Sequence, residues 1–515
     1  MKKILTKVGF ALLLGLLVAS CDIERVPKGS LDAGQSLASV QDAKNWDNGL
    51  MATFRGRHRS SYDVIQDRMG DQLNAYVNFG NRGGSPHGWA SLNSGDYDLR
   101  DVYRGYYSAL KNVNTVIGKI ESVVTETDDD KAVVKQIAGN AHFLRAFYYA
   151  NLTLRFGYRY SAATADKDLS VPLVLAYNPI ETPARATNKQ VYDQIFEDLR
   201  IAKENLAAVK GVAMADYITV DACTALEARV RLYMADYQGA YAAAKQLADA
   251  TTYPLVAPTK ENIVKMWRND QSTEEILQLY ISKPDELPNT NDYYGASVSL
   301  ANKAKKKINT PDWLPSKWII DLYEDTDLRK NVYFEMTNIQ YEETIWDNLY
   351  VISKFKGNPA YATVTGESYW DAEFLPNGIN APKVFRVAEM YLIAAEAASK
   401  LSDDTNAKKY LNALRASRGL AAVEASGDAL FNAIKDERTR ELAFEGFRLW
   451  DLRRWGMDMV RRQPQTDASG NSEFLYKAIP LNLSIKNNDF RFIWGIPSND
   501  MNTNPNLKGQ QNPGW

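Results

Sequence analysis

The chain contains 515 residues, of which 45% are hydrophobic and 24% are charged, so it is long enough for one large or two medium domains. Its 61 basic and 63 acidic residues give a formal net charge of −2, which argues against nucleic acid as a partner, because nucleic-acid-binding proteins carry a basic excess. Aromatic residues make up 11% of the chain, including 29 Tyr and 11 Trp, and supply many flat, hydrogen-bonding surfaces.

The N-terminus predicts export and a lipid anchor. Residues 1–7 carry three lysines, and the apolar run 8–19 is well short of the roughly 20 residues that span a bilayer, so residues 1–20 are an expected signal peptide. Residues 18–21, Val-Ala-Ser-Cys, resemble the bacterial lipobox, which makes Cys21 the expected lipid attachment residue. The alternative is a soluble secreted protein. Residues 21–36 are polar and predict a tether.

Helical periodicity dominates the chain after the tether. Apolar residues recur at helical spacing from Leu144 to Leu152, from Leu226 to Tyr237 and from Met390 to Leu401. No region shows regularly spaced alternating strands separated by tight turns. The sequence therefore predicts a mainly α fold. The second cysteine, Cys223, lies within such a pattern and is expected to be a buried, inert thiol without a disulfide partner.

The predicted helices come in pairs. Residues 219–235 with 240–250, and 389–400 with 406–417, are each expected to form a pair joined by a short turn, and residues 142–155 are expected to pair with 189–206 later in the chain. This layout resembles tetratricopeptide units, in which stacked pairs bury apolar faces that one pair alone leaves exposed. The repeats are imperfect, so a scaffold of tetratricopeptide-like pairs is expected rather than a regular solenoid.

Residues 434–455 are dense in charge. Opposite charges recur three or four positions apart, with Asp436 facing Arg440 and Glu445 facing Arg448. Such pairs support a helix, and this role is favoured over a role in a site.

Three long segments between the helices are irregular. They are rich in Gly, Asn, Ser and Pro, and they span residues 74–101, 284–312 and 358–382. Loops of this length are functional or disordered, and disordered segments rarely keep many aromatic residues. We therefore expect ordered surface, with a few short strands, that builds the ligand-binding half.

The sequence offers no enzyme signature, and the protein is predicted not to be an enzyme. It has three histidines far apart, and it lacks HExxH, CxxC, GxSxG and P-loop motifs. Catalytic zinc needs three protein ligands close together, and the sequence has no such cluster, so no cofactor or metal is predicted. The sequence does not decide whether a structural calcium ion supports a loop. Residues 128–130, Asp-Asp-Asp, are more simply explained as a solvated turn. A glycosidase needs two carboxylates, and 63 acidic residues leave that alternative open.

Several segments together resemble the SusD/RagB family, the outer-membrane nutrient-binding lipoproteins of the Bacteroidetes. The segments that carry the resemblance are Glu437–Arg448, Trp450–Trp455, Leu144–Tyr149, Phe156–Gly157 with Val171–Leu173, Arg386–Ala397, Trp494–Pro497 and Gln510–Trp515. The resemblance covers essentially the whole mature chain and identifies it as a member of that family.

The resemblance implies a fold, a location and partners. It implies helix pairs packed under an irregular ligand-binding half, with an N-terminal region 37–270 and a C-terminal region 271–515 forming one compact unit. It implies a lipid-anchored protein of the outer membrane that faces the cell exterior. The implied partners are a glycan and a SusC-like TonB-dependent transporter, to which the captured glycan is delivered.

Ligand-binding residues are expected among the loop aromatics and their polar neighbours. Sugars have an apolar face on which Trp or Tyr rings stack and a polar rim that Asn, Asp, Gln and Arg bind. The predicted ligand-binding residues are Asp71, Arg82, Trp89, Asn93, Tyr97, Tyr293, Tyr294 and Trp370. Three alternatives remain: a peptide-binding member of the same family, a surface glycoside hydrolase, and a scaffold that binds only protein.

Overall fold

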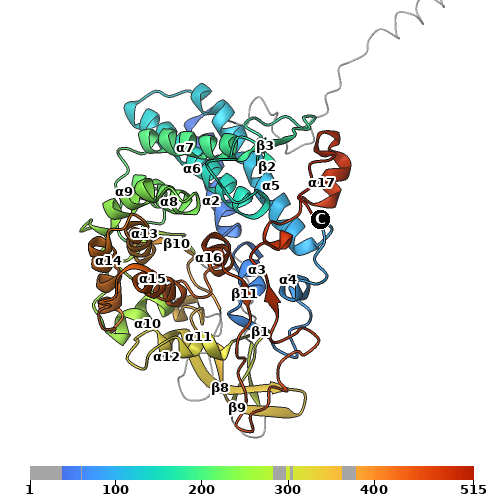
Figure 1. Ribbon diagram of the computed structural model, residues 1–515. Helices are drawn as coiled ribbons and strands as arrows, with labels where there is room; N and C mark the ends of the chain where they lie inside the picture. Colours follow the sequence, from blue (N-terminus) through green and yellow to red (C-terminus); the bar gives the residue numbers. More distant parts are fainter. Residues whose placement is uncertain (1–36, 59–60, 282–296, 302–305, 362–377) are drawn as a thin grey trace, which may run out of the picture.

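The computed structural model describes residues 37–58, 61–281, 297–301, 306–361 and 378–515 (Figure 1). The fold is mainly α-helical, which confirms the predicted fold class. None of the helices in these ranges is both long and apolar enough to span a bilayer.

The helices divide into a first group of nine and a second group of seven along the described chain. The first group consists of α2 (Val40–Gly56), α3 (Ser61–Met69), α4 (Gly84–Gly88), α5 (Tyr97–Lys119), α6 (Asp128–Phe156), α7 (Asn188–Asn205), α8 (Val220–Tyr233), α9 (Tyr237–Ala248) and α10 (Lys260–Arg268). The second consists of α11 (Lys317–Asp321), α12 (Lys330–Tyr333), α13 (Val387–Lys400), α14 (Asp404–Ser417), α15 (Gly427–Glu441), α16 (Arg448–Trp455) and α17 (Ser498–Thr503). Four short 3₁₀ turns are η1 (Ile120–Ser122), η2 (Pro359–Tyr361), η3 (Phe490–Phe492) and η4 (Pro505–Leu507).

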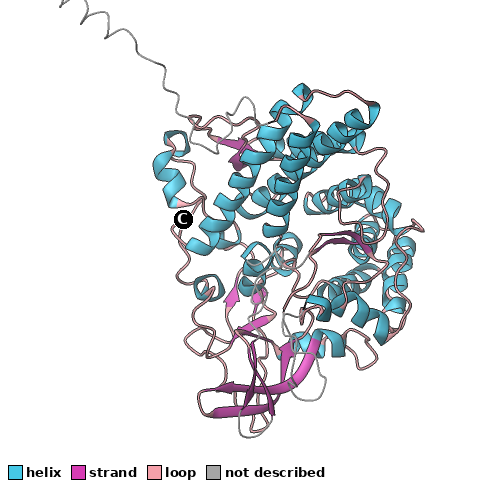
Figure 2. Ribbon diagram, turned by 180° about the vertical axis from the view of Figure 1, so that it is seen from behind, coloured by secondary structure: helices cyan, strands magenta, loops and turns pink. Residues whose placement is uncertain are grey.

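The strands are short and form small sheets. They are β1 (Leu73–Ala75), β2 (Leu169–Pro172), β3 (Arg185–Thr187), β4 (Glu275–Gln278), β5 (Ser297–Ala301), β6 (Lys306–Thr310), β7 (Trp313–Pro315), β8 (Phe334–Tyr341), β9 (Thr344–Ile352), β10 (Lys383–Arg386), β11 (Met459–Val460) and β12 (Ser484–Ile485). The pairs β1-β7, β10-β4, β11-β12 and β2-β3 are antiparallel, and one sheet has the order β5-β6-β8-β9. Figure 2 shows the largest of these sheets at the end of the molecule opposite the long helices.

The predicted helix pairs are present. Helices α8 and α9, α13 and α14, and α6 and α7 pack against each other, close to the residue ranges expected from the sequence. Residues 128–130 form the first turn of α6 and not a separate solvated turn. Thr127 and Asp130 form a capping box there, and negative charge at a helix N-terminus stabilises the helix dipole. The likeness of the pairs to tetratricopeptide units stays a prediction.

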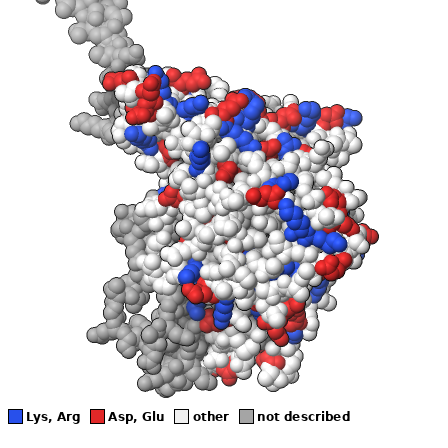
Figure 3. All heavy atoms as spheres, turned by 90° about the vertical axis from the view of Figure 1, so that its left-hand side faces the viewer, with Lys and Arg blue, Asp and Glu red and all other residues white. Residues whose placement is uncertain are grey.

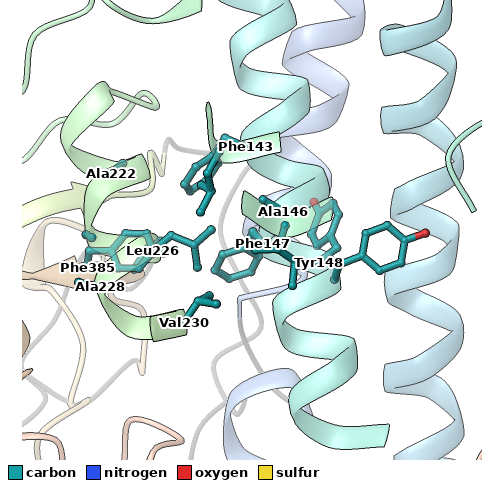
Figure 4. Packing of buried hydrophobic residues seen from close by; sticks show 14 of the residues in the cluster. Phe143, Ala146, Phe147, Tyr148, Ala222, Leu226, Ala228, Val230 and Phe385 are labelled. Atoms are coloured by element: carbon teal, nitrogen blue, oxygen red, sulfur yellow. The ribbon is translucent and has the colours of Figure 1, made fainter. Parts of the chain in front are cut away.

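The core joins the N-terminal helices to the helix pairs. Figure 4 shows Phe143 and Phe147 of α6 pointing toward Leu226 and Val230 of α8. All four side chains are at most 4% exposed, and their cluster includes residues from Leu37 to Leu507. The thiol of Cys223 lies in the same core, which confirms the predicted buried free cysteine.

The outer surface of the helix pairs carries mixed charge. Figure 3 shows the face formed by the helices at the left of Figure 1, where basic and acidic residues lie side by side. This mixture agrees with the net charge of −2 and gives this face no extended area of one sign.

Residues 434–455 differ from the prediction, because they form two helices and most of their charged side chains are buried. Helix α15 ends at Glu441, and α16 begins at Arg448. Arg440 pairs with Glu437 at 2.8 Å, not with Asp436. Arg448 pairs with Asp71 at 2.8 Å, not with Glu445. Arg448 is therefore held by a tertiary partner, whereas the partner of Arg440 is a buried neighbour three positions away in α15.

A buried ion cluster is the centre of this arrangement. Its members are charged side chains from six parts of the chain, all of them buried except the partly buried Glu445, namely Glu274, Asp327, Arg329, Lys354, Arg386, Arg418, Glu437, Glu441 and Glu445. The Glu441 carboxylate accepts hydrogen bonds from Arg329 at 2.8 Å, Arg418 at 2.9 Å and Arg386 at 2.5 Å. Burial opposes its charge, but these three guanidinium groups outweigh burial and hold the pKa of Glu441 well below its usual range.

The turn between α15 and α16 depends on Gly446. Its φ is 80°, and a Cβ at this position would lie 2.6 Å from the Asp63 carbonyl oxygen. We expect Gly446→Ala to lower the free energy of unfolding by at least about 1–3 kcal/mol, because the strained backbone and the clash add. Urea denaturation measures the change. Gly470→Ala is the control, since its φ is 77° and nothing lies within 4 Å. Equal losses for the two variants would contradict the role of the close contact.

Candidate functional site

The prediction that Trp89 offers its ring to a ligand is wrong for this structure. The side chain is 0% exposed, and the indole Nε1 donates a hydrogen bond to the Met69 carbonyl at 2.9 Å. Its ring packs against Phe492 with 5.1 Å between centroids. A large ring whose polar atom is satisfied inside the protein contributes to packing, and it holds residues 71–97, which we call the early loop, against the rest of the protein.

The prediction for Asp71 is also wrong, because this carboxylate is enclosed by protein. Asp71 is 1% exposed, and both its oxygens accept hydrogen bonds from Arg448 at 2.8 Å. Because the carboxylate is buried and each oxygen is bound by Arg448, a sugar hydroxyl has no access to it.

The remaining predicted residues are either exposed or outside the described ranges. The Arg82 side chain is 60% exposed and forms an ion pair with Asp312. Asn93 is exposed and accepts a hydrogen bond from the Gly95 backbone at 2.8 Å, and Tyr97 at the start of α5 is 54% exposed. Their contact with a ligand stays a prediction. Three further predicted residues, Tyr293, Tyr294 and Trp370, lie outside the described residues.

A cleft that the sequence did not predict lies beside the last segments of the chain. We call it the C-terminal cleft, and its volume is about 310 Å³. It is lined by Tyr158, Arg159, Arg453, Gly456, Asn487, Asn488, Asp489, Phe490, Phe492, Ile493, Asn512 and Pro513. Small-molecule sites in proteins range from about 300 to 1,000 Å³, so the cleft has room for a sugar unit.

Helix ends position two walls of the C-terminal cleft. Helix α6 ends at Phe156 and is followed by the cap residue Gly157, where a Cβ would lie 2.7 Å from the Thr153 carbonyl oxygen, and the chain then turns to Tyr158 and Arg159. Helix α16 ends at Trp455 and is capped by Gly456, whose φ of 67° is left-handed and reverses the chain. Two glycine-dependent helix ends therefore open the space between the walls.

The third wall is the segment 487–493. Asp489 caps the short turn η3 and pairs with Arg491 at 2.7 Å. Arg491 donates to the Trp89 carbonyl at 2.6 Å, so the buried early loop supports this wall from behind. Phe490 is 39% exposed, and its ring meets the Trp515 ring at 5.7 Å and an interplanar angle of 84°.

The C-terminal cleft combines the groups that sugars need. Phe490 supplies a flat apolar ring, and the exposed amides of Asn487 and Asn488 supply donors and acceptors. Arg453 and Arg159 supply positive charge, and burial lowers the pKa of Arg453 to about 10. Amides followed by an aromatic residue in 487–490 are a pattern that sequence reasoning is able to find, but nothing in that pattern distinguishes this turn from other polar turns.

A second cavity lies between α3, α6, α8 and α16, and it is smaller. Its volume is about 90 Å³, and its lining includes Arg155, Arg229, Glu389 and Trp450. Arg229 and Glu389 pair at 2.6 Å, so these two charges satisfy each other. Its size is far below that of a site for a sugar. Within the described ranges, no three side chains of His, Cys, Asp or Glu are grouped so that they could hold a metal ion.

Two family models match the chain. Residues 241–515, more than half of the chain, match the model described as SusD family. Residues 40–232 match a model described as starch-binding associating with outer membrane. The SusD-like protein P2 of Formosa agariphila is 25% identical over 512 residues, which cover 90% of this chain and 94% of that protein.

Solved structures share the fold. A SusD superfamily protein from Bacteroides thetaiotaomicron has a TM-score of 0.74 at 24% identity, covering 92% of this chain and 100% of that one. A putative sugar binding protein from Bacteroides vulgatus has a TM-score of 0.72 at 22% identity, covering 93% of this chain and 99% of that one. A SusD-like carbohydrate binding protein from the same species has a TM-score of 0.69 at 19% identity, with coverages of 92% and 98%.

Proposed function

The chain belongs to the SusD family, and from this premise we propose that it is a binding protein that captures glycans at the cell envelope. The names of similar proteins support the ligand class, because two of the solved structures are described as sugar or carbohydrate binding. The description of the model that matches residues 40–232 supports association with the outer membrane.

The observation that carries the proposal is the C-terminal cleft. An exposed ring, two amides and two arginines converge on a space of about 310 Å³. A sugar stacks its apolar face on a ring and gives its hydroxyl groups to amides and charged side chains. No enzyme activity is part of the proposal, since a binding role needs no reacting group.

The remaining parts of the proposal concern location and partner. We propose that lipid on Cys21 anchors the chain to the outer membrane with the body facing the cell exterior. We propose further that residues 37–270 and 271–515 act as one unit, which delivers the captured glycan to a SusC-like TonB-dependent transporter.

Replacing Phe490 by alanine tests the glycan site. We expect the variant to bind its glycan about tenfold more weakly, because the stacking surface is lost. Retardation in native gels that contain a panel of polysaccharides identifies the glycan, and calorimetry measures the affinity. Phe490→Tyr keeps a flat ring and is expected to bind like the unchanged protein.

The control for that experiment is Tyr217→Ala. Tyr217 is 37% exposed, close to the 39% of Phe490, and it lies outside the cleft lining. Equal affinity in Phe490→Ala and the unchanged protein would reject the cleft as the glycan site. Product formation from a bound glycan would instead favour the glycoside hydrolase alternative, and retardation by peptides alone would favour a peptide-binding member of the family.

A further inference from the structure

Arg453 differs from the other arginines of α16. Arg448 pairs with Asp71 at 2.8 Å, and Arg454 pairs with Asp451 at 2.8 Å. Arg453 is 8% exposed, and its one hydrogen bond in the described structure goes from Nη1 to the Phe492 carbonyl at 3.1 Å. No carboxylate of the described residues forms an ion pair with Arg453. Its electrostatic neighbours are two tyrosines and two further arginines, namely Tyr192, Tyr233, Arg155 and Arg159.

Arg185 is a buried arginine whose hydrogen bonds are complete, in contrast to Arg453. Arg185 is 6% exposed and also lacks a carboxylate partner within the described ranges. Its guanidinium nitrogens nevertheless all donate hydrogen bonds, including those to the Ser170 carbonyl at 2.6 Å and the Gln510 carbonyl at 2.6 Å. Arg453 has no such set of carbonyls, and it lines a cleft instead of a closed core. The guanidinium carbon of Arg453 lies 5.2 Å from the centre of the Trp450 ring, a cation–π contact, but no carboxylate in the described part of the chain offsets its charge. A buried cation with so little compensation is costly, and a ligand anion would supply the missing partner.

The charges around the C-terminal cleft favour an anion. Arg159 is exposed in the lining and adds a second positive charge. Asp489 is the acidic residue of the lining, and Arg491 neutralises it through contacts at 2.8 and 2.7 Å. A guanidinium group presents parallel donors that match a carboxylate or a sulfate.

We propose that the C-terminal cleft binds an acidic sugar, with Arg453 and Arg159 holding its carboxylate or sulfate group. Phe490 and the amides of Asn487 and Asn488 contact the sugar ring itself. This inference rests on the proposed glycan-binding function and names the chemical class of the glycan.

Matched pairs of glycans test the proposal by calorimetry with the full mature protein. An oligogalacturonate against its methyl ester varies a carboxylate, and a sulfated galactan against its desulfated form varies a sulfate. We expect the charged member of one pair to bind about tenfold or more tightly than its neutral member. The preferred pair identifies whether carboxylate or sulfate is the natural group. The preference should fall with added salt, because screening weakens charge attraction.

Arginine variants show whether the preference for charged glycans comes from the C-terminal cleft or from the overall charge of the protein. Arg453→Gln and Arg159→Gln should each reduce the ratio between charged and neutral affinity, and Arg453→Lys should retain part of it. Arg462→Gln removes an equal charge outside the cleft lining and should keep the ratio. An arginine kept only for the fold would lower the thermal midpoint when replaced, whereas Arg453→Gln should leave the midpoint unchanged or raise it.

The outcomes distinguish the two proposals. If the neutral and the charged glycan of each pair bind equally to the unchanged protein, the acidic-sugar inference is overturned, and the proposed glycan binding still stands. A ratio that survives both glutamine variants would also overturn it. Binding of none of these glycans, together with no retardation by the polysaccharide panel, would overturn both.

Discussion

Replacing Glu441 by glutamine is expected to lower the free energy of unfolding by about 3–5 kcal/mol at pH 7. Glu441 is 0% exposed and accepts hydrogen bonds from Arg329, Arg386 and Arg418. Glutamine has nearly the same shape, but it carries no charge and accepts at a single oxygen. Three arginines then stay buried with too little negative charge, and this accounts for the size of the loss.

The loss depends on pH in a defined direction. The pKa of Glu441 is held well below its ordinary value in the folded protein, so its charge stabilises the fold above the unfolded pKa of about 4.3. As pH falls below that value toward the folded pKa, the unchanged protein loses this stabilisation and the variant does not. The stability difference should therefore be complete at pH 7 and shrink progressively below about pH 4. Urea denaturation followed by circular dichroism at pH 7, 4 and 3 measures it.

A surface glutamate is the control for the Glu441 experiment. Glu197 pairs with Arg200 at 2.7 Å on the exposed face of α7, and Glu197→Gln should leave stability within experimental error. Glu441→Asp keeps the charge on a shorter side chain and should lose less than Glu441→Gln. Equal stability of Glu441→Gln and the unchanged protein at pH 7 would reject the role given to the buried ion cluster.

Replacing Cys21 by serine is expected to move the protein from the membrane fraction to the soluble fraction. Each buried methylene of an acyl chain contributes about 0.8 kcal/mol, so several chains make release negligible while they are present. Serine cannot form the thioether that carries the lipid. Fractionation of the native host followed by immunoblotting measures the distribution, and mass spectrometry of the N-terminal peptide identifies the acyl groups.

The second cysteine provides the control for lipid attachment. Cys223 lies in the core at 0% exposure, and burial raises the pKa of its thiol to about 12. Cys223→Ala should therefore stay in the membrane fraction. Membrane retention of Cys21→Ser would contradict the lipid anchor, and accessibility to protease added to intact cells tests outward exposure separately.

The sequence predicted the helices well, because burial of apolar stripes fixes them. The expected helices 389–400 and 406–417 correspond to α13 (Val387–Lys400) and α14 (Asp404–Ser417). It predicted the charges of 434–455 poorly. Spacing along the chain suggests Glu445 as the partner of Arg448, but spacing carries no information about tertiary contacts, and the folded partner is Asp71, 377 positions away.

The candidate site was the least predictable part, because it joins segments distant in sequence. Residues 158–159, 453–456, 487–493 and 512–513 meet at the C-terminal cleft. Trp89 was favoured because aromatic residues in polar loops often face a ligand, yet it is buried against Phe492. Composition identifies a residue that is able to stack, and only tertiary structure shows whether its face is accessible.

The contacts that enclose the early loop have a consequence for biosynthesis. Trp89 and Arg491 are separated by 402 residues, and Asp71 and Arg448 are separated by 377. At ribosomal speeds of about 5–20 residues per second, the early loop waits roughly 20–80 s for its partners to be made. During that interval a tryptophan and an unpaired acid are open to solvent and to chaperones. The nascent chain therefore stays unfinished for most of its translation, a state suited to threading through a secretion channel.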